Sequence, residues 1–302
     1  LKPFGSSKLE PEPPPPRVPN LCSPSQQMAP RLPCLWLPMV LALPLLHVRA
    51  LRSSRPTPVC RGTALQKIAS LTPKNIYLTA FDEKYAERAA DYALKAASRG
   101  LTFVGACRGP TCAKTFKDRT AGKCSTCHVL DCAEYDVPIE PEILKSSFCQ
   151  GWRRIQFTKV YAFHDFLVLG KTVLLTDLDI GVPHEGIFDS AQKMLGSKDF
   201  LILKRDPELM NFGILYARSS SGTRQLAVDL REKVSHAWDQ AAWNELMQEE
   251  ELRGTVTCKV PPNDWTESMG LKKVKSKLEI PRCGLNELYG KHDDRHPKCV
   301  ES

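Results

Sequence analysis

The chain has 302 residues, and its hydrophobic fraction of 42% is ordinary for a globular protein with one large or two small domains. Much of its net charge of +8 arises near the N-terminus, because no Asp or Glu lies between Glu12 and Asp82. The rest of the chain is not strongly basic and has no compact basic stripe with interleaved aromatic residues, so a nucleic-acid partner is not expected.

The first 27 residues precede a more plausible start of translation at Met28. Residues 11–19, PEPPPPRVP, cannot form a helix or a central strand, because proline lacks the backbone donor that both require. We therefore expect residues 1–27 to be a disordered or untranslated extension.

Residues 28–50 have the organisation of a targeting segment. A basic start, MAPR, leads into the apolar run LPCLWLPMVLALPLL and then to a small residue at Ala50. This order predicts a cleaved signal peptide or a short membrane anchor through residues 32–48, whereas the Arg- and Ser-rich sequence that follows would also suit a transit peptide. The expected location is the secretory pathway, in the Golgi or ER lumen, with secretion or a plastid as alternatives. Residues 51–73 are predicted to be a linker.

Cysteine is frequent, with 12 residues in the chain. Half of them lie in one segment: Cys107, Cys112, Cys124, Cys127, Cys132 and Cys149. Such a cluster fits a secreted or lumenal protein, in which disulfides persist, and we expect a structural staple on a long loop. A zinc site that includes Cys124, Cys127 and Cys132 is one alternative, although their spacing is irregular, and free thiols are another.

The folded region is predicted to start near Lys74. Residues 75–80 are typical of a short strand, residues 82–100 place alanines on one stripe of a helix that stops at Gly100, and residues 101–107 form a second apolar strand. A strand, a one-faced helix and a strand within about 30 residues indicate a βαβ unit, and hence a parallel sheet with a right-handed crossover.

After the cysteine segment, residues 157–170 have a broad apolar helical face and lead directly into the apolar strand TVLLT. The elements predicted beyond it are strands at 199–204 and 212–218 and helices at 221–238 and 239–254. We therefore expect a single α/β domain over residues 74–260, followed by a poorly specified C-terminal segment, residues 261–302.

Two acidic residues, Asp177 and Asp179, follow the TVLLT strand directly. Ligands of open α/β sheets bind at the carboxyl ends of the strands, and a spacing of two places both side chains on one side of an extended backbone. Paired carboxylates attract Mg²⁺ or Mn²⁺, which take one or two protein carboxylates and complete their coordination with phosphate oxygens and water. The pair therefore predicts a divalent cation that carries a diphosphate, with a solvated turn as the alternative.

Four segments occur in the order seen in one enzyme family. They are IYLTAFDEKYAERAADYAL, GWRRIQFTKVYAFHDFLVLGKTVLLTDLDIGV, MNFGILYARSS and WDQAAWNEL. Together they resemble the nucleotide-diphospho-sugar transferase family, the GT-A-type glycosyltransferases that include plant cell-wall arabinosyl- and xylosyltransferases. The resemblance implies an α/β fold, a GT-A-like Rossmann-type sandwich with a mainly parallel central sheet and helices on both faces.

The same resemblance implies an activity, the metal-dependent transfer of a sugar from a nucleoside-diphosphate sugar to an acceptor hydroxyl with retention of configuration. The cofactor would be Mn²⁺ or Mg²⁺, and the partners would be a nucleotide-sugar donor and a glycan or glycoprotein acceptor. Asp179 would bind the metal directly, and Asp177 would meet the metal or the ribose. Lys159 would offset phosphate charge, while Thr79 and Ala80 would lie beside the base and ribose.

Four further residues take roles by the same resemblance. Asn211 and Gly213 would line the sugar pocket, and Asp239 and Gln240 would face the donor sugar or the acceptor hydroxyl. Asn211, Asp239 and Gln240 are therefore the predicted catalytic residues, and Gly213 is a predicted donor-binding residue. Simpler structural roles are also open, since Asn211 could cap a turn, Asp239 could cap a helix and Lys159 could be a solvated lysine.

Two rival interpretations concern the acidic pair. The sequence LLTDLDIGV also resembles the strand end of haloacid-dehalogenase-type phosphatases, in which Asp177 would be the nucleophile and Asp179 the general acid and base. That motif usually opens its domain, whereas here a βαβ unit precedes it. A catalytically inactive glycosyltransferase-like protein is the other interpretation, because no late histidine that could complete a metal shell lies in a recognisable motif.

Overall fold

The computed structural model describes residues 63–132, 147–206, 209–235, 237–252, 254–272, 274 and 300–301. All of them belong to the second of two compact units of the chain, Ser53–Ser302. The predicted extension and targeting segment, residues 1–50, lie outside the described residues. Among the residues that are described, no helix is both long enough and apolar enough to cross a membrane.

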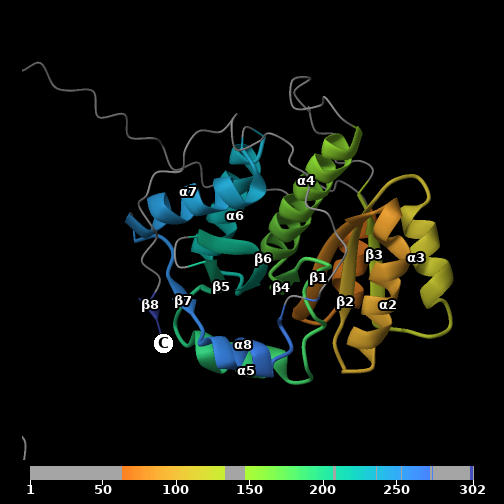
Figure 1. The fold of residues 1–302 in the computed structure, drawn as a ribbon, viewed down its shortest axis with the longest axis horizontal. Helices are drawn as coiled ribbons and strands as arrows, with labels where there is room; N and C mark the ends of the chain where they lie inside the picture. The colour runs from red at the N-terminus through yellow and green to blue at the C-terminus, as the bar shows by residue number, and fades with distance from the viewer. Residues whose placement is uncertain are drawn as a thin grey trace, which may run out of the picture. The chain divides into compact units, whose positions relative to one another are not determined.

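Within the described residues, one mixed sheet of eight strands forms the centre of the unit (Figure 1). The strands are β1 (Asn75–Asp82), β2 (Phe103–Arg108), β3 (Cys127–Asp131), β4 (Thr172–Thr176), β5 (Phe200–Asp206), β6 (Leu209–Ala217), β7 (Cys258–Val260) and β8 (Val300–Glu301). Their order across the sheet is β3-β2-β1-β4-β6-β5-β7-β8. Of these neighbouring pairs, only β4 with β6 and β5 with β6 are antiparallel, so the predicted, mainly parallel sheet is confirmed.

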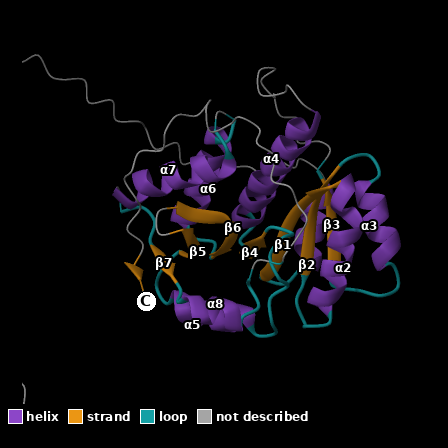
Figure 2. Cartoon of the chain, viewed as in Figure 1, coloured by secondary structure: helices purple, strands orange, loops and turns teal. Residues whose placement is uncertain are grey.

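Helices cover both faces of the sheet, as Figures 1 and 2 show. They are α1 (Thr63–Leu71), α2 (Ala86–Ala97), α3 (Cys112–Thr120), α4 (Ser147–Val168), α5 (Ile187–Leu195), α6 (Ser221–Lys233), α7 (Asp239–Leu252) and α8 (Asn263–Ser268). The buried residues form two hydrophobic clusters. The first joins the sheet to α1, α4, α6 and α7, and the second joins it to α2, α3, α5 and the residues around α8. The expected α/β sandwich is therefore confirmed.

The first βαβ unit has the elements that the sequence predicted. β1, α2 and β2 occupy the expected positions, and β1 pairs with β2 in parallel. The buried face of α2 consists of alanines, whose small side chains let the helix lie close to the sheet: Ala86, Ala89, Ala90, Ala93 and Ala96. The chain turns away from the helix at Gly100, whose φ of 70° lies in the left-handed region that favours glycine.

The cysteine segment contains two disulfides. One joins Cys107 to Cys112, and the other joins Cys124 to Cys127. The expected staples are therefore confirmed, and the zinc alternative is wrong for Cys124 and Cys127, because their sulfur atoms are bonded to each other.

The same segment is more regular than the long loop that the sequence predicted, because it contains α3 and β3. The helix is only 9 residues long, and its large apolar residue is Phe116, which stacks on both Phe81 and Phe103. A single aromatic anchor gives no visible helical period, so tertiary packing, and not a repeated pattern, fixes this element.

The folded unit extends beyond both predicted boundaries, residues 74 and 260. On the N-terminal side, α1 lies in the predicted linker and buries Leu65 and Ile68 in the core. On the C-terminal side, α8 and the residues after it pack against the sheet, and Leu271 is buried. Both boundaries were placed too far inward, because helices of 9 and 6 residues are too short for an apolar period to stand out.

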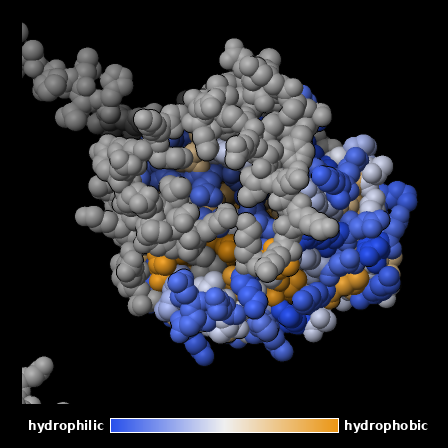
Figure 3. Space-filling view, viewed as in Figure 1, coloured by the Kyte–Doolittle hydropathy of each residue, from blue (hydrophilic) through white to orange (hydrophobic). Residues whose placement is uncertain are grey.

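The described surface in Figure 3 is mostly hydrophilic, and hydrophobic residues show only in separate patches. Among the described residues, the large hydrophobic side chains that remain exposed are those of Leu71 and Val274. Exposed apolar residues are common on any protein, whereas buried polar groups need partners and mark places where the chain does more than fold. The buried polar groups are therefore the more informative feature.

Candidate active site

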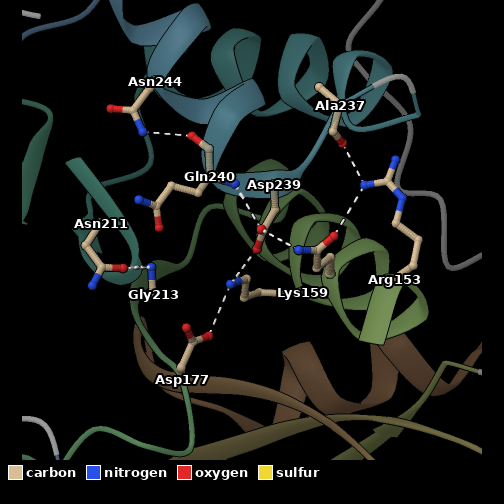
Figure 4. Close-up of polar contacts among 10 residues, drawn as sticks. Arg153, Lys159, Asp177, Asn211, Gly213, Ala237, Asp239, Gln240 and Asn244 are labelled. Atoms are coloured by element: carbon tan, nitrogen blue, oxygen red, sulfur yellow. Dashed lines mark hydrogen bonds and ion pairs between the residues drawn. The ribbon is translucent and has the colours of Figure 1, made fainter. Parts of the chain in front are cut away.

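A buried lysine, Lys159 in α4, lies at the centre of a polar cluster (Figure 4). Its side chain is 9% exposed, and its Nζ atom lies 2.6 Å from Asp239 Oδ2 and 3.1 Å from Asp177 Oδ1. The ring of Phe212 packs against the same ammonium, with its centroid 5.0 Å from Nζ. One buried cation therefore bridges two carboxylates, and Lys159 is not the solvated residue of the simpler interpretation.

Burial and neighbouring charges shift the ionisation of this cluster in opposite directions. Burial lowers the pKa of Lys159, but the carboxylates of Asp177 and Asp239 more than offset it, so the net shift is upward. The side chain of Asp177 is 44% exposed, yet its pKa is raised, mainly because part of the carboxyl is removed from water. The charge of Lys159 lowers this pKa, whereas the charges of Asp239 and Asp179 raise it. Two carboxylates share the ammonium of Lys159, and a third, that of Asp179, lies near Asp177, so these four side chains keep an excess of negative charge that suits a cationic ligand.

The acidic pair stands at the carboxyl end of β4, a strand whose five residues are all buried. Leu178 and Ile180 are buried, whereas Asp177 and Asp179 are partly exposed. The chain turns directly after the strand, where the backbone N–H of Ile180 donates to the carbonyl of Asp177 over 3.1 Å, so the two acids stand on a tight turn and not on the extended backbone that the spacing of two assumed.

Gly213 makes room for Asp177. β6 runs antiparallel to β4, and the carbonyl of Gly213 accepts a hydrogen bond of 2.9 Å from the backbone N–H of Asp177. A Cβ atom on Gly213 would collide with Asp177 Oδ2 and would lie 2.9 Å from Asn211 Oδ1. Asn211 Oδ1 in turn accepts from the backbone N–H of Gly213 over 2.7 Å, a local contact within β6 and not the cap of a turn. Only a residue without a side chain fits between the acid and the amide.

Asp239 is the first residue of α7, and its side chain is 6% exposed. Its Oδ1 accepts 2.9 Å from the backbone N–H of Gln240, so the carboxylate also satisfies one of the free donors at the helix start. One turn later, Asn244 Nδ2 donates to the carbonyl of Gln240 over 2.7 Å. In Figure 4 the side chains of Asn211 and Gln240 lie on the same side of the Lys159–Asp239 ion pair. Helix capping and ion pairing therefore coexist in Asp239.

Side chains from α4, the end of β4, β6 and the start of α7 thus meet at one place. Residues 145–276, which contain all of them, match the sequence profile of the nucleotide-diphospho-sugar transferases. Over these residues the chain is therefore similar to that family. The predicted resemblance is confirmed for the family as a whole, and the match gives no support for its plant cell-wall members in particular.

Solved structures overlap the transferase only weakly. The galactosyltransferase LgtC, solved with donor and acceptor sugar analogs, is 13% identical, and the overlap covers 70% of this chain and 91% of that chain with a TM-score of 0.39. The glycosyltransferase GlyE of Streptococcus pneumoniae TIGR4 is 19% identical, with 58% of this chain and 43% of that chain covered and a TM-score of 0.38. A search of the curated proteins found no match.

Two residues of the transferase that the sequence analysis did not assign belong to the same cluster. Gln156 Nε2 donates to Asp239 Oδ1 over 3.0 Å, and Arg153 Nη1 donates to Gln156 Oε1 over 3.3 Å. Arg153, Gln156 and Lys159 are spaced three residues apart on α4 and are all buried, so they share one face of the helix. The repeat of polar residues at this spacing along the helix is the signal that could have identified them.

The loop that follows Asp179 in the transferase is held from two sides. On the first side, Arg99 Nη1 from the end of α2 donates to the carbonyls of Val182 and Pro183. A guanidinium has several donors in a rigid plane, so one side chain can fix two consecutive carbonyls. This contact sets the path of the chain as it leaves the acidic pair.

On the second side lies a strap, which we define as residues 269–272 and Val274. The backbone N–H of Gly181 donates to the carbonyl of Lys272 over 2.8 Å, and the N–H of Val274 donates to the carbonyl of Asp179 over 2.7 Å. The loop and the strap therefore exchange backbone hydrogen bonds, although the sequence places them far apart. The strap begins after residue 260, in the segment that the sequence analysis left outside the domain.

Thr79 and Ala80, which were predicted beside the base and ribose, lie on the strand next to β4. β1 pairs with β4 in parallel up to Leu78 and Leu175, so both residues are at the same sheet edge as the acidic pair. Thr79 is fully buried, and its hydroxyl donates to the carbonyl of Thr176 over 3.1 Å. Its side chain therefore ties the two strands together, and neither residue takes part in the ionic cluster.

The residues at the end of β4 fit the divalent cation that the family resemblance implies. In the described parts of the chain, no group of three or more His, Cys, Asp and Glu side chains could hold a metal ion. Asp177 and Asp179 suffice for Mg²⁺ or Mn²⁺ nevertheless, because these ions take one or two protein carboxylates and fill their remaining positions with phosphate oxygens and water. The partial exposure of both acids leaves space for such ligands.

Proposed function

We propose that the transferase moves a sugar from a nucleoside-diphosphate sugar to an acceptor hydroxyl with the help of Mn²⁺ or Mg²⁺. The observation that carries this proposal is the convergence of Lys159, Asp177, Asn211 and Asp239 from four elements of the fold. All four lie within the segment that matches the family, and their net charge is negative until a cation is added.

Asp177 and Asp179 would hold the cation. When bound, the metal would stabilise the negative charge of the departing diphosphate. Lys159 supplies a second, permanent positive charge beside Asp177, and its position in the protein interior keeps that charge from being screened by water. The chain therefore provides a fixed cationic side chain next to the place where a diphosphate would lie.

Asp239, Asn211 and Gln240 would orient the hydroxyl groups of the donor sugar and the acceptor. A carboxylate accepts hydrogen bonds only, whereas a carboxamide both donates and accepts, so together they can distinguish hydroxyl positions. The amide of Gln240 is partly exposed beside the buried carboxylate of Asp239, where a sugar could reach both. Interactions of this kind fix the geometry of the reactants and lower the entropic part of the barrier.

The proposed reaction retains the configuration at the anomeric carbon without a covalent enzyme intermediate. The bond between the anomeric carbon and the diphosphate oxygen breaks, and the acceptor oxygen forms the new bond on the same face. The acceptor's proton passes to the phosphate oxygen that leaves. The residues of the chain hold and orient the two reactants, and none of them becomes covalently attached.

The proposal places the transferase in the lumen of the secretory pathway, with a glycan or glycoprotein as acceptor. The disulfides Cys107–Cys112 and Cys124–Cys127 support this location, because disulfides persist in oxidising compartments. The segment proposed as a signal or membrane anchor, residues 32–48, lies outside the described residues.

The direct test is a screen of nucleoside-diphosphate sugars for hydrolysis in the presence of Mn²⁺. The wild type should release the nucleoside diphosphate from one of them, and Asp179→Ala should abolish this release while the circular-dichroism spectrum stays unchanged. Asp118→Ala, which removes an exposed carboxylate on α3, is the matched control and should keep full activity. A fully active Asp179→Ala variant would contradict the proposed metal site.

The rival functions give different results in the same preparation. A haloacid-dehalogenase-type phosphatase would release phosphate from a generic phosphomonoester and lose that activity in Asp177→Asn. An inactive transferase-like protein would hydrolyse no nucleotide sugar but could still be stabilised by UDP and Mn²⁺, because a ligand that binds the folded state raises the melting temperature.

A further inference from the structure

We propose that Gln156 and Arg153 are positioning residues that fix the Asp239 carboxylate in the orientation required for sugar transfer. The inference rests on the proposed function, in which Asp239 meets a sugar or acceptor hydroxyl. Neither residue reaches the substrate itself; both act through Asp239.

Arg153 is anchored at the end of α6. The residue is 1% exposed, and its guanidinium donates to the carbonyls of Val234 and Ala237, the latter over 2.6 Å. It also packs over the ring of Phe157, whose centroid lies 4.5 Å away. Val234 is the residue directly after α6, where carbonyls lack partners within the helix and carry partial negative charge, and Ala237 lies in the connection to α7, so the buried guanidinium is stabilised by both carbonyls. The position of Nη1 is therefore set by the backbone around it.

The fixed guanidinium decides which way the amide of Gln156 points. Arginine has donors and no acceptor, so the atom of Gln156 that faces Arg153 must be the oxygen, Oε1. The amide nitrogen is then turned toward Asp239, where it donates to Oδ1 over 3.0 Å. Both neighbours favour the same orientation of the amide, because Arg153 only donates and the Asp239 carboxylate only accepts.

The same hydrogen bonds select which oxygen of Asp239 remains available. A carboxylate accepts about four hydrogen bonds, two at each oxygen. Oδ1 receives both Gln156 Nε2 and the backbone N–H of Gln240, whereas Oδ2 receives Lys159 Nζ. One acceptor position therefore remains on Oδ2, next to the ammonium. A hydroxyl bound there would be aligned with Lys159 and, through it, with Asp177.

A purely structural tie between α4 and α6 would need only the bonds from Arg153 to the two carbonyls. Gln156 adds nothing to that tie, since its amide nitrogen points to the cluster and not to α6. The fixed orientation of the Gln156 amide therefore points to a role in orienting the Asp239 carboxylate. The distinction between the two roles can be measured.

The test compares Gln156→Met with Gln225→Met in the full-length protein. Both substitutions replace a helical glutamine that donates to an aspartate at 3.0 Å, but Gln225 and its partner Asp229 are exposed on α6. With the nucleotide sugar that the wild type hydrolyses fastest, Gln156→Met should lower kcat by about 10- to 100-fold, since a small displacement of a reacting group costs up to two orders of magnitude. The KM of the donor should stay within about threefold, because the loss concerns the transition state.

Two further measurements separate positioning from folding. The rise in melting temperature with UDP and Mn²⁺ should be the same in Gln156→Met and the wild type, because Asp239 does not contact the nucleotide in the proposed function. Arg153→Lys should show the same fall in kcat as Gln156→Met, because the ammonium of lysine cannot make all the hydrogen bonds of the planar guanidinium. Wild-type kcat in Gln156→Met would overturn the inference.

Crystal structures of the wild type and Gln156→Met decide the matter independently of turnover. The Asp239 carboxylate should rotate away from its wild-type position in the variant, and an unmoved carboxylate would overturn the inference. If the wild type hydrolysed no nucleotide sugar at all, the proposed function would fail, while the position of Asp239 in the two crystals would still judge the role of Gln156.

Discussion

Lys159 is the residue that allows two carboxylates, Asp177 and Asp239, to lie close together inside the transferase. Its ammonium is within hydrogen-bond distance of both, and both raise its pKa despite its burial. A lysine on a flexible stem can follow small movements of either acid, which a rigid guanidinium could not do equally well. Lys159 therefore holds the two carboxylates in place and also offsets part of their negative charge.

Replacement of Lys159 by Met should destabilise the fold. The substitution leaves the buried Asp239 without its counter-ion, and breaking a buried pair in this way costs about 3 kcal/mol, at the low end because Asp177 is partly solvated. Urea unfolding would measure the loss. Lys114→Met, which breaks an exposed pair with Asp118 on α3, should leave the midpoint unchanged. Equal midpoints for the two variants would contradict this account.

Gly213→Ala should affect activity more than stability. The new methyl group would occupy the space of Asp177 Oδ2, so the carboxylate must move, and we expect turnover of the nucleotide sugar to fall by about 100-fold. Gly151→Ala, at the N-terminal part of α4, is the control, since a Cβ there meets no atom closer than 4.0 Å. Normal turnover in Gly213→Ala would show that Asp177 tolerates displacement.

For single residues, the sequence was sufficient to identify candidate site residues but not the contacts between them. The pair Asp177 and Asp179 could be recognised because two acids directly after a buried apolar strand stand out in the sequence, although the turn that carries them could not. The link from Gln156 to Asp239 could not, because it depends on how α4 passes the junction between α6 and α7. A spacing of three residues shows that polar groups share a helix face, but it does not show what lies opposite that face.

At the scale of elements, the strap and the acidic loop form a unit that only tertiary structure creates. Gly270 has a φ of 77°, and its backbone lies against the ring of His184 and the neighbouring carbonyl of Val182. The close approach of the two segments is possible because the strap has glycine at this point, while the facing loop has glycine at Gly181.

Gly270→Ala should loosen this unit. A Cβ there would lie 2.6 Å from His184 Cδ2, in addition to the strain of a left-handed backbone. Gly254→Ala is a matched control, because Gly254 has a φ of 68° but open space around it, so it isolates the backbone strain. Gly270→Ala should therefore melt at a lower temperature than Gly254→Ala and gain less stability from UDP and Mn²⁺. Identical behaviour of the two would mean that the contact with His184 is unimportant.

The elements that the sequence predicted correctly are those with a strong local pattern. The strand at 75–80 and the alanine stripe after it correspond to β1 and α2, and the apolar run before Asp177 corresponds to β4. The elements it missed are α1, α3, β3, α5, β7, α8 and β8, none of which is longer than 9 residues. Over so few residues an apolar period is hard to distinguish from chance, even in α5, where Ile187, Ala191 and Leu195 are buried on one face.

For the whole molecule, burial of tyrosines predicts a loss of stability at alkaline pH. Burial raises the pKa of Tyr77 above its ordinary range and raises the pKa of Tyr216 to about 12. In the unfolded chain both phenols ionise at about pH 10. Between these values the unfolded chain binds fewer protons than the folded chain, so the free energy of unfolding falls as the pH rises.

The stability contributed by the neutral phenol of Tyr216 should therefore be complete below about pH 10 and should be lost as the pH rises through about 12, whereas that of Tyr77 should persist to higher pH. Urea unfolding at intervals from neutral to strongly alkaline pH would measure it. Tyr216→Phe removes one of the two groups and should make the decline shallower. A decline of the same steepness in this variant would assign the pH dependence to other groups.

The hydrogen bonds between the strap and the loop after Asp179 have a consequence for proteolysis, because loss of activity and unfolding need not occur together. The sheet and its helices up to α7 contain most of the buried residues, whereas the backbone hydrogen bonds to the carbonyl of Asp179 and the N–H of Gly181 come from residues beyond Val260. A protease that trimmed the chain at that point would leave most of the core in place but would remove the backbone partners of the turn at Asp177 and Asp179. Under the proposed function, such a fragment should lose turnover of the nucleotide sugar before it unfolds.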